Sequence, residues 1–202
     1  MTSNDPSPSR LPFLAVMTTW YVGRRHVTAR LAATEVRLTE FFEAIAVNPP
    51  VRIPGTGVFM TARDQGAPPI LVHHLTHNKV LHEQVIFLTV TIVEVPSVPP
   101  GEMVRVERLQ DGFYRVLARF GYMQPPDVPM ALERARASGL GMQPGDTSYY
   151  LASLTLFANA RLGMSTWRDK LFIFLSRNAR RATNFFRIPP HRVVEIGIQL
   201  EI

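Results

Sequence analysis

The chain has 202 residues, 46% of them hydrophobic and 19% charged, with no cysteine and a net charge of +6. The length fits one ordinary domain with an appendage, and the hydrophobic fraction excludes wholesale disorder. The lack of cysteine excludes a disulfide scaffold, a cysteine-ligated metal centre and thiol chemistry, and we expect the chain to face the cytosol. No apolar run reaches about 18 residues, so no ordinary transmembrane helix is predicted.

The first 25 residues combine a polar leader with a short apolar run. Residues 1–10 are polar and interrupted by prolines, which predicts a disordered leader. The run at 11–22 would form a helix of about 18 Å, too short for a hydrocarbon core of about 30 Å. Aromatic and then basic residues end the run, as at the cytoplasmic interface of a membrane helix; they are Trp20, Tyr21, Arg24 and Arg25. We interpret residues 11–25 as the stump of a last membrane helix, although a short buried helix of a soluble domain explains them equally well.

A helix, a turn and a strand are predicted next. Apolar residues at helical spacing, ended by Asn48 and two prolines, predict a connecting helix over 26–49. Residues 54–57 are interpreted as a turn, because they lack the lysine of a phosphate-binding P-loop and precede a strand rather than a helix. The strand is predicted over residues 58–61.

Four of the six histidines lie within ten residues; they are His73, His74, His77 and His82. A short helix is predicted over 70–78, with Asn78 as its left-handed C-cap. On that helix His73 and His77 share a face at the spacing of a two-histidine metal site, but no third ligand is evident. A packed or surface helix end is therefore favoured over metal binding, and a pH-sensitive or ligand-contacting role stays open.

The strongest strand signal covers residues 85–95, which are β-branched and apolar, as in the centre of a covered sheet. Asp111 and Gly112 separate two alternating segments and predict a β-hairpin. Asp127 is the predicted N-cap of a helix over 128–138.

The last part of the chain completes an α/β pattern. Strands are predicted over 147–157 and 193–202, with a long helix from about residue 165 to 186 between them. The order of elements predicts an α/β domain over residues 50–202, with a mixed sheet and flanking helices, in which the hairpin supplies the antiparallel part.

Basic side chains converge on one stripe of this long helix; they are Arg177, Arg180 and Arg181. Arginine favours bidentate recognition of phosphate, so the three are a candidate contact for a phosphate, a nucleotide or a lipid headgroup. A solvated helix face or the rim of a dimer is the alternative. Nucleic acid is not expected as a partner, because no stacking aromatic residues alternate with these arginines.

Several segments resemble one family. The run His-Asn-Lys-Val-Leu-His-Glu at 77–83, followed by an apolar strand, is similar to a signature of the cytosolic C-terminal domain of Kup-type potassium uptake proteins. The resemblance extends from about residue 14 to the C-terminus and includes residues 17–20, 52–61, 120–123, 126–129, 176–179 and 185–195. The chain departs from the family pattern in having Ala152, Ser153 and Leu154 where Gly-Arg-Glu is usual, and Tyr21 and Val22 where basic residues are common.

The resemblance implies the cytosolic C-terminal regulatory and dimerisation portion of a potassium:proton symporter, apparently truncated, on the cytoplasmic side of the inner (plasma) membrane. It implies a universal-stress-like fold preceded by the end of a membrane helix, and no enzymatic activity, metal or cofactor. The expected partners are a second copy, the membrane part of a potassium transporter and an anionic membrane surface. The alternative is a soluble sensor of a nucleotide or cyclic dinucleotide, since related importers respond to cyclic di-AMP.

Overall fold

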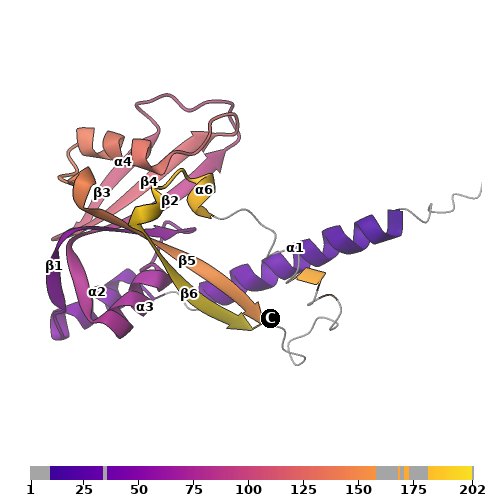
Figure 1. Ribbon diagram of the computed structural model, residues 1–202, viewed down its shortest axis with the longest axis horizontal. Helices are drawn as coiled ribbons and strands as arrows, with labels where there is room; N and C mark the ends of the chain where they lie inside the picture. The colour runs from indigo at the N-terminus through magenta and orange to yellow at the C-terminus, as the bar shows by residue number, and fades with distance from the viewer. Residues whose placement is uncertain (1–9, 34–35, 158–167, 169–170, 173–181, 202) are drawn as a thin grey trace, which may run out of the picture. The chain divides into compact units, whose positions relative to one another are not determined.

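The computed structural model describes residues 10–33, 36–157, 168, 171–172 and 182–201 (Figure 1). The chain divides into two compact units. The first consists of residues 1–34, 154–179 and 198–202, and the second of residues 35–153 and 180–197.

The first unit contains a long helix, α1 (Arg10–Ala33). One face of α1 packs against Phe172, whose ring lies 5.6 Å from that of Trp20. Gly23 permits this contact, because a Cβ atom there would lie 2.3 Å from the Phe172 ring. Thr19 is buried on the same helix and accepts a hydrogen bond of 3.2 Å from Nε of Arg168. Among the described residues, no helix combines the length and the apolar character needed to cross a membrane.

The second unit begins with an extended residue, Val36, and a separate helix. Residues 26–49 are divided between the end of α1 and a separate helix, α2 (Leu38–Val47), rather than forming one connecting helix. Val36 lies between them and forms an isolated antiparallel bridge with Ala67. That bridge requires extended backbone, which interrupts the helical spacing of apolar residues.

The other described helices are α3 (Pro69–Asn78), α4 (Val128–Ala137) and the short α6 (Ala182–Phe185). The strands are β1 (Val51–Thr61), β2 (Val80–Val93), β3 (Val104–Gln110), β4 (Phe113–Gly121), β5 (Thr147–Phe157) and β6 (Val193–Glu201). They form a sheet in the order β3-β4-β2-β1-β5-β6. Strand β1 pairs in parallel with β2 and β5, β2 pairs in parallel with β4, and β3 and β4 are antiparallel. The predicted α/β class, mixed sheet and hairpin are confirmed.

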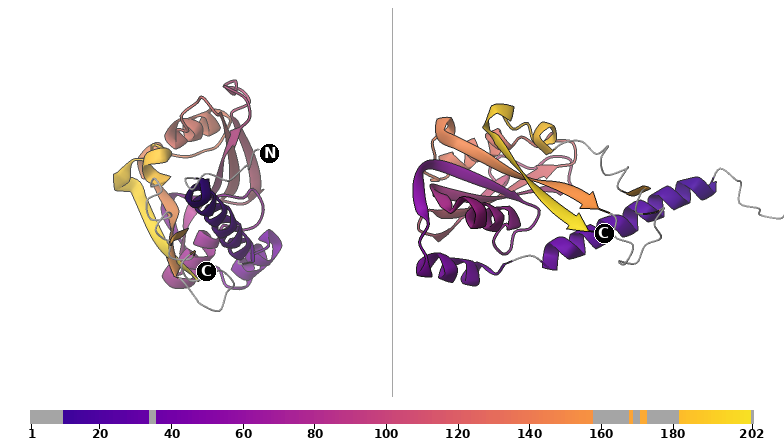
Figure 2. Two further views of the ribbon diagram at one scale, coloured as in Figure 1. Left: turned by 90° about the vertical axis from the view of Figure 1, so that its right-hand side faces the viewer. Right: turned by 60° about the horizontal axis from the view of Figure 1, so that its bottom comes forward.

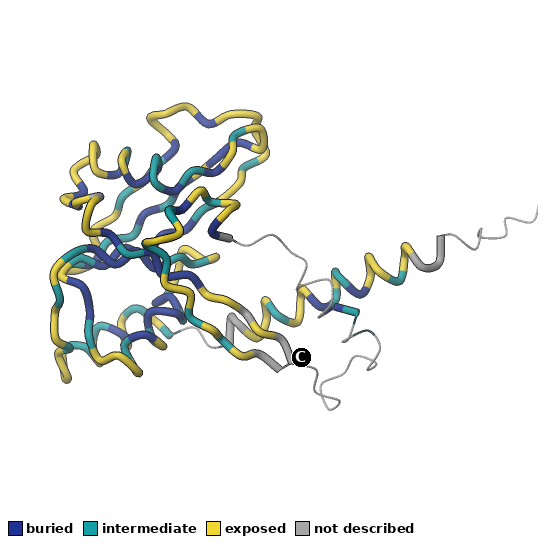
Figure 3. Tube along the Cα trace, viewed as in Figure 1, coloured by how far each residue is buried: buried dark blue, intermediate teal, exposed yellow. Residues whose placement is uncertain are grey.

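Helices cover both faces of this sheet (Figures 1 and 2). Side chains alternate along the central strand β2: Ile86 and Leu88 join the core beneath α4, whereas Val85 and Phe87 join the core beneath α2 and α3. All four are at most 1% exposed, and the buried path along β2 is visible in Figure 3. Burial of each such side chain contributes about 1.5–3 kcal/mol to the stability of the fold. Burial on both faces requires apolar residues at consecutive positions, which explains why this segment has the strongest strand signal in the sequence.

Two local predictions are wrong. Residues 54–57 do not form a turn, because β1 continues through them with a register shift between Ile53 and Thr56 and a positive φ of 96° at Gly55. The left-handed C-cap of α3 is Lys79, with φ of 56°, rather than Asn78. The predicted helix over residues 165–186 lies largely outside the described residues.

Candidate functional site

The three arginines proposed as a phosphate contact, Arg177, Arg180 and Arg181, lie outside the described residues. The candidate membrane-interface residues all lie on α1. Trp20 is half-buried against Phe172, and the Arg24 guanidinium lies 5.9 Å from the centre of the Trp20 ring. Tyr21 is 69% exposed and Arg25 is exposed.

The structure separates the four clustered histidines into two pairs. His73 and His77 are exposed on α3, with ring centres 4.4 Å apart. His74 and His82 are buried, at 4% and 5% exposure, and both rings lie edge-on to the Tyr150 ring. No group of three or more potential metal ligands occurs among the described residues.

The buried pair is held in an aromatic environment near the amino end of β2. Tyr150 stacks on Phe59 with ring centres 4.4 Å apart, and the His74 ring lies 4.8 Å from Tyr150 and 5.7 Å from Phe59. The side-chain amide of Asn78 lies 2.9 Å from Nδ1 of His74. Nε2 of His74 is buried and makes no hydrogen bond of ordinary geometry. Burial lowers the pKa of His74 below its ordinary value of 6.5, and the Val80 backbone partly opposes this shift.

His82 is confined by the bulged strand β1. A Cβ atom at Gly57 would lie 2.8 Å from Nδ1 of His82, so only glycine fits there, and that nitrogen has no hydrogen-bond partner. The backbone carbonyl of His82 accepts a hydrogen bond of 2.9 Å from the Arg52 guanidinium. Burial lowers the pKa of His82, the His74 imidazole lowers it further, and the Asp146 carboxylate opposes them. Both imidazoles are therefore held neutral near pH 7.

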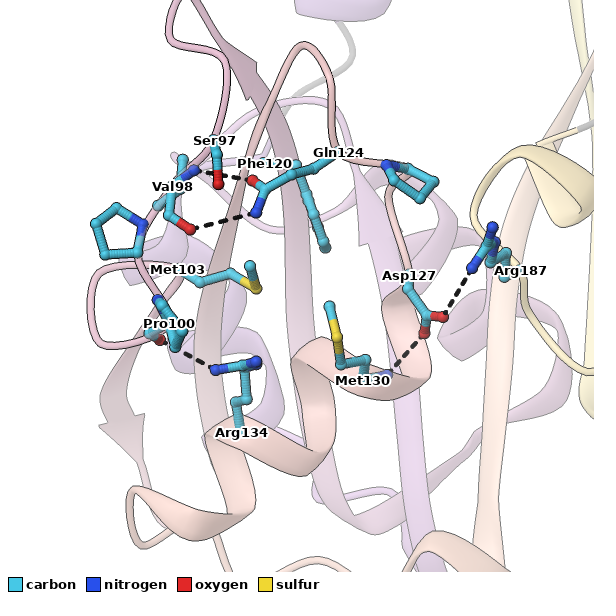
Figure 4. Close-up of a pocket in the computed structure, with 12 residues that line it drawn as sticks. Ser97, Val98, Pro100, Met103, Phe120, Gln124, Asp127, Met130, Arg134 and Arg187 are labelled. Atoms are coloured by element: carbon cyan, nitrogen blue, oxygen red, sulfur yellow. Dashed lines mark hydrogen bonds and ion pairs between the residues drawn. The ribbon is translucent and has the colours of Figure 1, made fainter.

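A second feature of the same unit is a cleft of about 440 Å³ beside the carboxyl ends of β2 and β4. In open α/β sheets, ligands bind beside the carboxyl ends of strands. The walls come from the segment between β2 and β3, from the end of β4 and the segment that follows it, from α4 and from the segment after α6. They comprise Ser97, Val98, Pro99, Pro100, Met103, Phe120, Gln124, Pro125, Asp127, Met130, Arg134 and Arg187 (Figure 4).

Gln124 fixes the shape of this cleft. Its side-chain oxygen accepts hydrogen bonds from the backbone N–H groups of Val98 (2.9 Å) and Gly121 (2.8 Å), and its amide donates to the Val98 carbonyl (3.3 Å). Gly121 has no room for a side chain, because a Cβ atom there would lie 2.3 Å from the carbonyl oxygen of Pro96. The segment after β2 is thereby held against the end of β4.

The charged residues of the cleft are Asp127, Arg134 and Arg187. Asp127 is the N-cap of α4, as predicted: its Oδ1 accepts a hydrogen bond of 2.9 Å from the Met130 N–H. Its Oδ2 lies 3.7 Å from the Arg187 guanidinium. Arg134 projects into the cleft from the second turn of α4 (Figure 4).

Sequence reasoning did not identify Arg134 or Arg187 as site residues. The two are far apart in the chain but line the same cleft. A 3.1 Å hydrogen bond from the Val128 N–H to the Phe186 carbonyl holds the segment that carries Arg187 at the start of α4. The resemblance was an available signal for Arg187, which lies in the segment 185–195, but not for Arg134, which lies outside every segment that carried it.

Comparisons with known proteins agree on one family. The family model described as K+ potassium transporter C-terminal domain matches residues 54–202. A probable potassium transport system protein Kup from Myxococcus xanthus is 50% identical over 187 residues, which cover 93% of this chain and 29% of that relative. Kup 1 of Geobacter sulfurreducens is 48% identical over 198 residues, covering 98% and 31%. The Kup protein of Xanthomonas euvesicatoria is 45% identical over 193 residues, covering 95% and 30%. No solved structure matches the chain.

Proposed function

The chain belongs to the K+ potassium transporter C-terminal domain family, and we propose that it acts in potassium uptake as the cytosolic C-terminal portion of a Kup-type potassium:proton symporter. The observation that carries this proposal is the extent of the match. At least 93% of this chain aligns with each of the three relatives described, yet it spans only about 30% of their length.

The proposed role is regulation and dimerisation at the cytoplasmic side of the inner membrane. The second unit supports it by supplying a covered sheet with buried cores on both faces, which is suited to a stable domain. The layered arrangement of parallel strands and helices accords with a universal-stress-like fold. In this proposal α1 continues a membrane helix, and its aromatic and basic residues lie at the membrane interface.

A complementation experiment tests the proposal. The chain is produced in a bacterium that lacks its potassium uptake systems, alone or together with the membrane part of the Myxococcus xanthus relative without its own C-terminal portion. We expect no growth at limiting potassium with this chain alone, because translocation needs polar groups held at bilayer depth. We expect none with the membrane part alone, because in this proposal that part requires its cytosolic portion. Growth restored only by co-production supports the proposal. Growth with this chain alone, or equal growth of the membrane part with an unrelated protein, contradicts it.

Self-association is tested separately by sedimentation of the purified chain over a range of micromolar concentrations. A dimer supports the proposed role, and a monomer at every concentration contradicts it. The alternative of a nucleotide sensor rested on Arg177, Arg180 and Arg181, which lie outside the described residues.

A further inference from the structure

Arg134 is a cation without a matching anion. Its guanidinium is half-buried and makes one long hydrogen bond, 3.4 Å from Nη1 to the Pro100 carbonyl, whereas Nε is buried without a partner. The neighbouring Glu133 is paired with Arg136 instead, at 3.0 Å. Within the described part of the chain, no carboxylate forms an ion pair with Arg134. A partly desolvated guanidinium with unused N–H groups favours an anionic partner.

Arg187 adds a second positive charge to the same cleft. It has a left-handed backbone (φ 54°), lies 3.7 Å from Asp127 and keeps its side chain 58% exposed. Asp127 is already engaged, because its other carboxylate oxygen caps α4. The three charged groups therefore leave the cleft with one net positive charge.

Apart from Ser97 and Gln124, the remaining walls are apolar. Val98, Met103 and Phe120 are buried beneath the cleft, at most 4% exposed, and Met130 extends over them from α4 (Figure 4). Methionine side chains adapt to ligands of different shape. A volume of about 440 Å³ is within the range of small-molecule sites, in which apolar walls surround a few polar groups.

We propose that this cleft binds a small organic anion, with its carboxylate or phosphate group paired to Arg134 and its apolar part against Met103 and Met130. An inorganic anion makes no contact with the apolar walls, and a neutral apolar molecule leaves the Arg134 guanidinium unpaired, so both halves of the ligand are needed. The source is a soluble metabolite or the headgroup of a lipid. This inference goes beyond the proposed transport role and does not depend on it.

The test is a titration of the full chain with a small anionic probe. Binding is measured by isothermal titration calorimetry and by the shifts of backbone amide NMR signals. Phenyl phosphate is the probe, with inorganic phosphate and phenol as its two separated halves. We expect phenyl phosphate to bind at least tenfold more tightly than either half and to shift amide signals around residues 97–103 and 127–134. Equal binding of phenyl phosphate and inorganic phosphate overturns the proposal.

Two substitutions locate the site. Arg134→Gln should weaken phenyl phosphate binding at least tenfold, whereas Arg136→Gln on the exposed side of the same helix should leave it unchanged. Arg187→Gln, at an exposed position, should weaken binding even if Arg134→Gln impairs folding. Binding that no variant changes, or that both the Arg134 and the Arg136 variants weaken equally, overturns the proposal.

Vesicles containing phosphatidic acid distinguish the two sources. Vesicle binding that the Arg134 or the Arg187 substitution abolishes assigns the anion to a lipid headgroup, and phenyl phosphate binding without vesicle binding assigns it to a soluble molecule. Vesicle binding that neither substitution changes, together with no phenyl phosphate binding, overturns the proposal.

Discussion

Acidification should destabilise the second unit through His74 and His82. Both imidazoles are buried, each has one nitrogen without a hydrogen-bond partner, and burial is the largest cause that lowers the pKa of each. The groups around them are Tyr150 on β5, Arg52 on β1, Asp146 before β5 and Asn78 on α3; of these, the Asp146 carboxylate opposes the shift of His82.

The sign follows from proton binding in the two states. Below pH 6.5, the ordinary histidine pKa, the unfolded chain binds protons at these positions that the folded chain does not. The free energy of unfolding therefore decreases as the pH is lowered. This decrease in the free energy of unfolding is absent above pH 6.5. It stops once the pH is below the pKa values of the two histidines in the folded chain. A histidine that stays neutral when folded costs about 1.4 kcal/mol per pH unit below 6.5. The two together set an upper limit of about 2.7 kcal/mol between pH 7.5 and 5.5.

Urea unfolding of the full chain at pH 7.5 and pH 5.5, followed by circular dichroism, measures this difference. The double variant His74→Asn/His82→Asn should lose most of it, even if its stability at pH 7.5 is lower. The matched control is His73→Asn/His77→Asn, which removes the two exposed histidines of α3, the helix that also carries His74. This control should keep the full pH dependence. The same pH dependence in both double variants would refute the argument.

Three further changes test the structure by urea unfolding. Gly112→Ala should destabilise the chain by more than about 1 kcal/mol, because Gly112 has a φ of 76° and a Cβ atom there would lie 2.5 Å from the Glu83 carbonyl oxygen. The control is Gly101→Ala, which faces open space and should have little effect. Asp127→Ala should cost about 1 kcal/mol by removing the cap of α4, and Asp127→Asn should restore most of it; equal losses in both would contradict a capping role. Phe59→Ala should cost about 3–5 kcal/mol, since Phe59 is fully buried and stacks on Tyr150; a loss below about 1 kcal/mol would contradict that packing.

Elements with a strong local cause were predictable from the sequence. The hairpin follows from Asp111 and Gly112, because a two-residue turn between alternating segments needs a positive φ, which Gly112 adopts. The start of α4 follows from Asp127, whose side chain can cap the helix without any distant contact. The central position of β2 follows from its apolar residues on both faces.

Features that depend on distant contacts were not predictable. Gly55 and Gly57 suggest a turn by local rules, but pairing with β2 and β5 keeps this segment in the sheet, where the glycines accommodate Asp146 and His82. Spacing alone paired His73 with His77 on one helical face, but which histidines become buried depends on the position of Tyr150, about seventy residues away along the chain. The charge pattern drew attention to the C-terminal arginines, whereas Arg134 stands out only once its lack of an acidic partner is known.

Five of the segments that carry the family resemblance gather at two places in the second unit. Residues 52–61 and 77–83 meet at the buried histidines, where Arg52 binds the His82 carbonyl and Gly57 leaves room for its ring. Residues 120–123, 126–129 and 185–195 meet at the cleft, where the backbone of Val128 is bonded to that of Phe186. At the first place the imidazoles are buried and neutral, so its residues are suited to holding β1, β2 and α3 together. The second is open and carries an unpaired guanidinium, which a packing role does not require. The cleft is therefore the better place to look for a ligand.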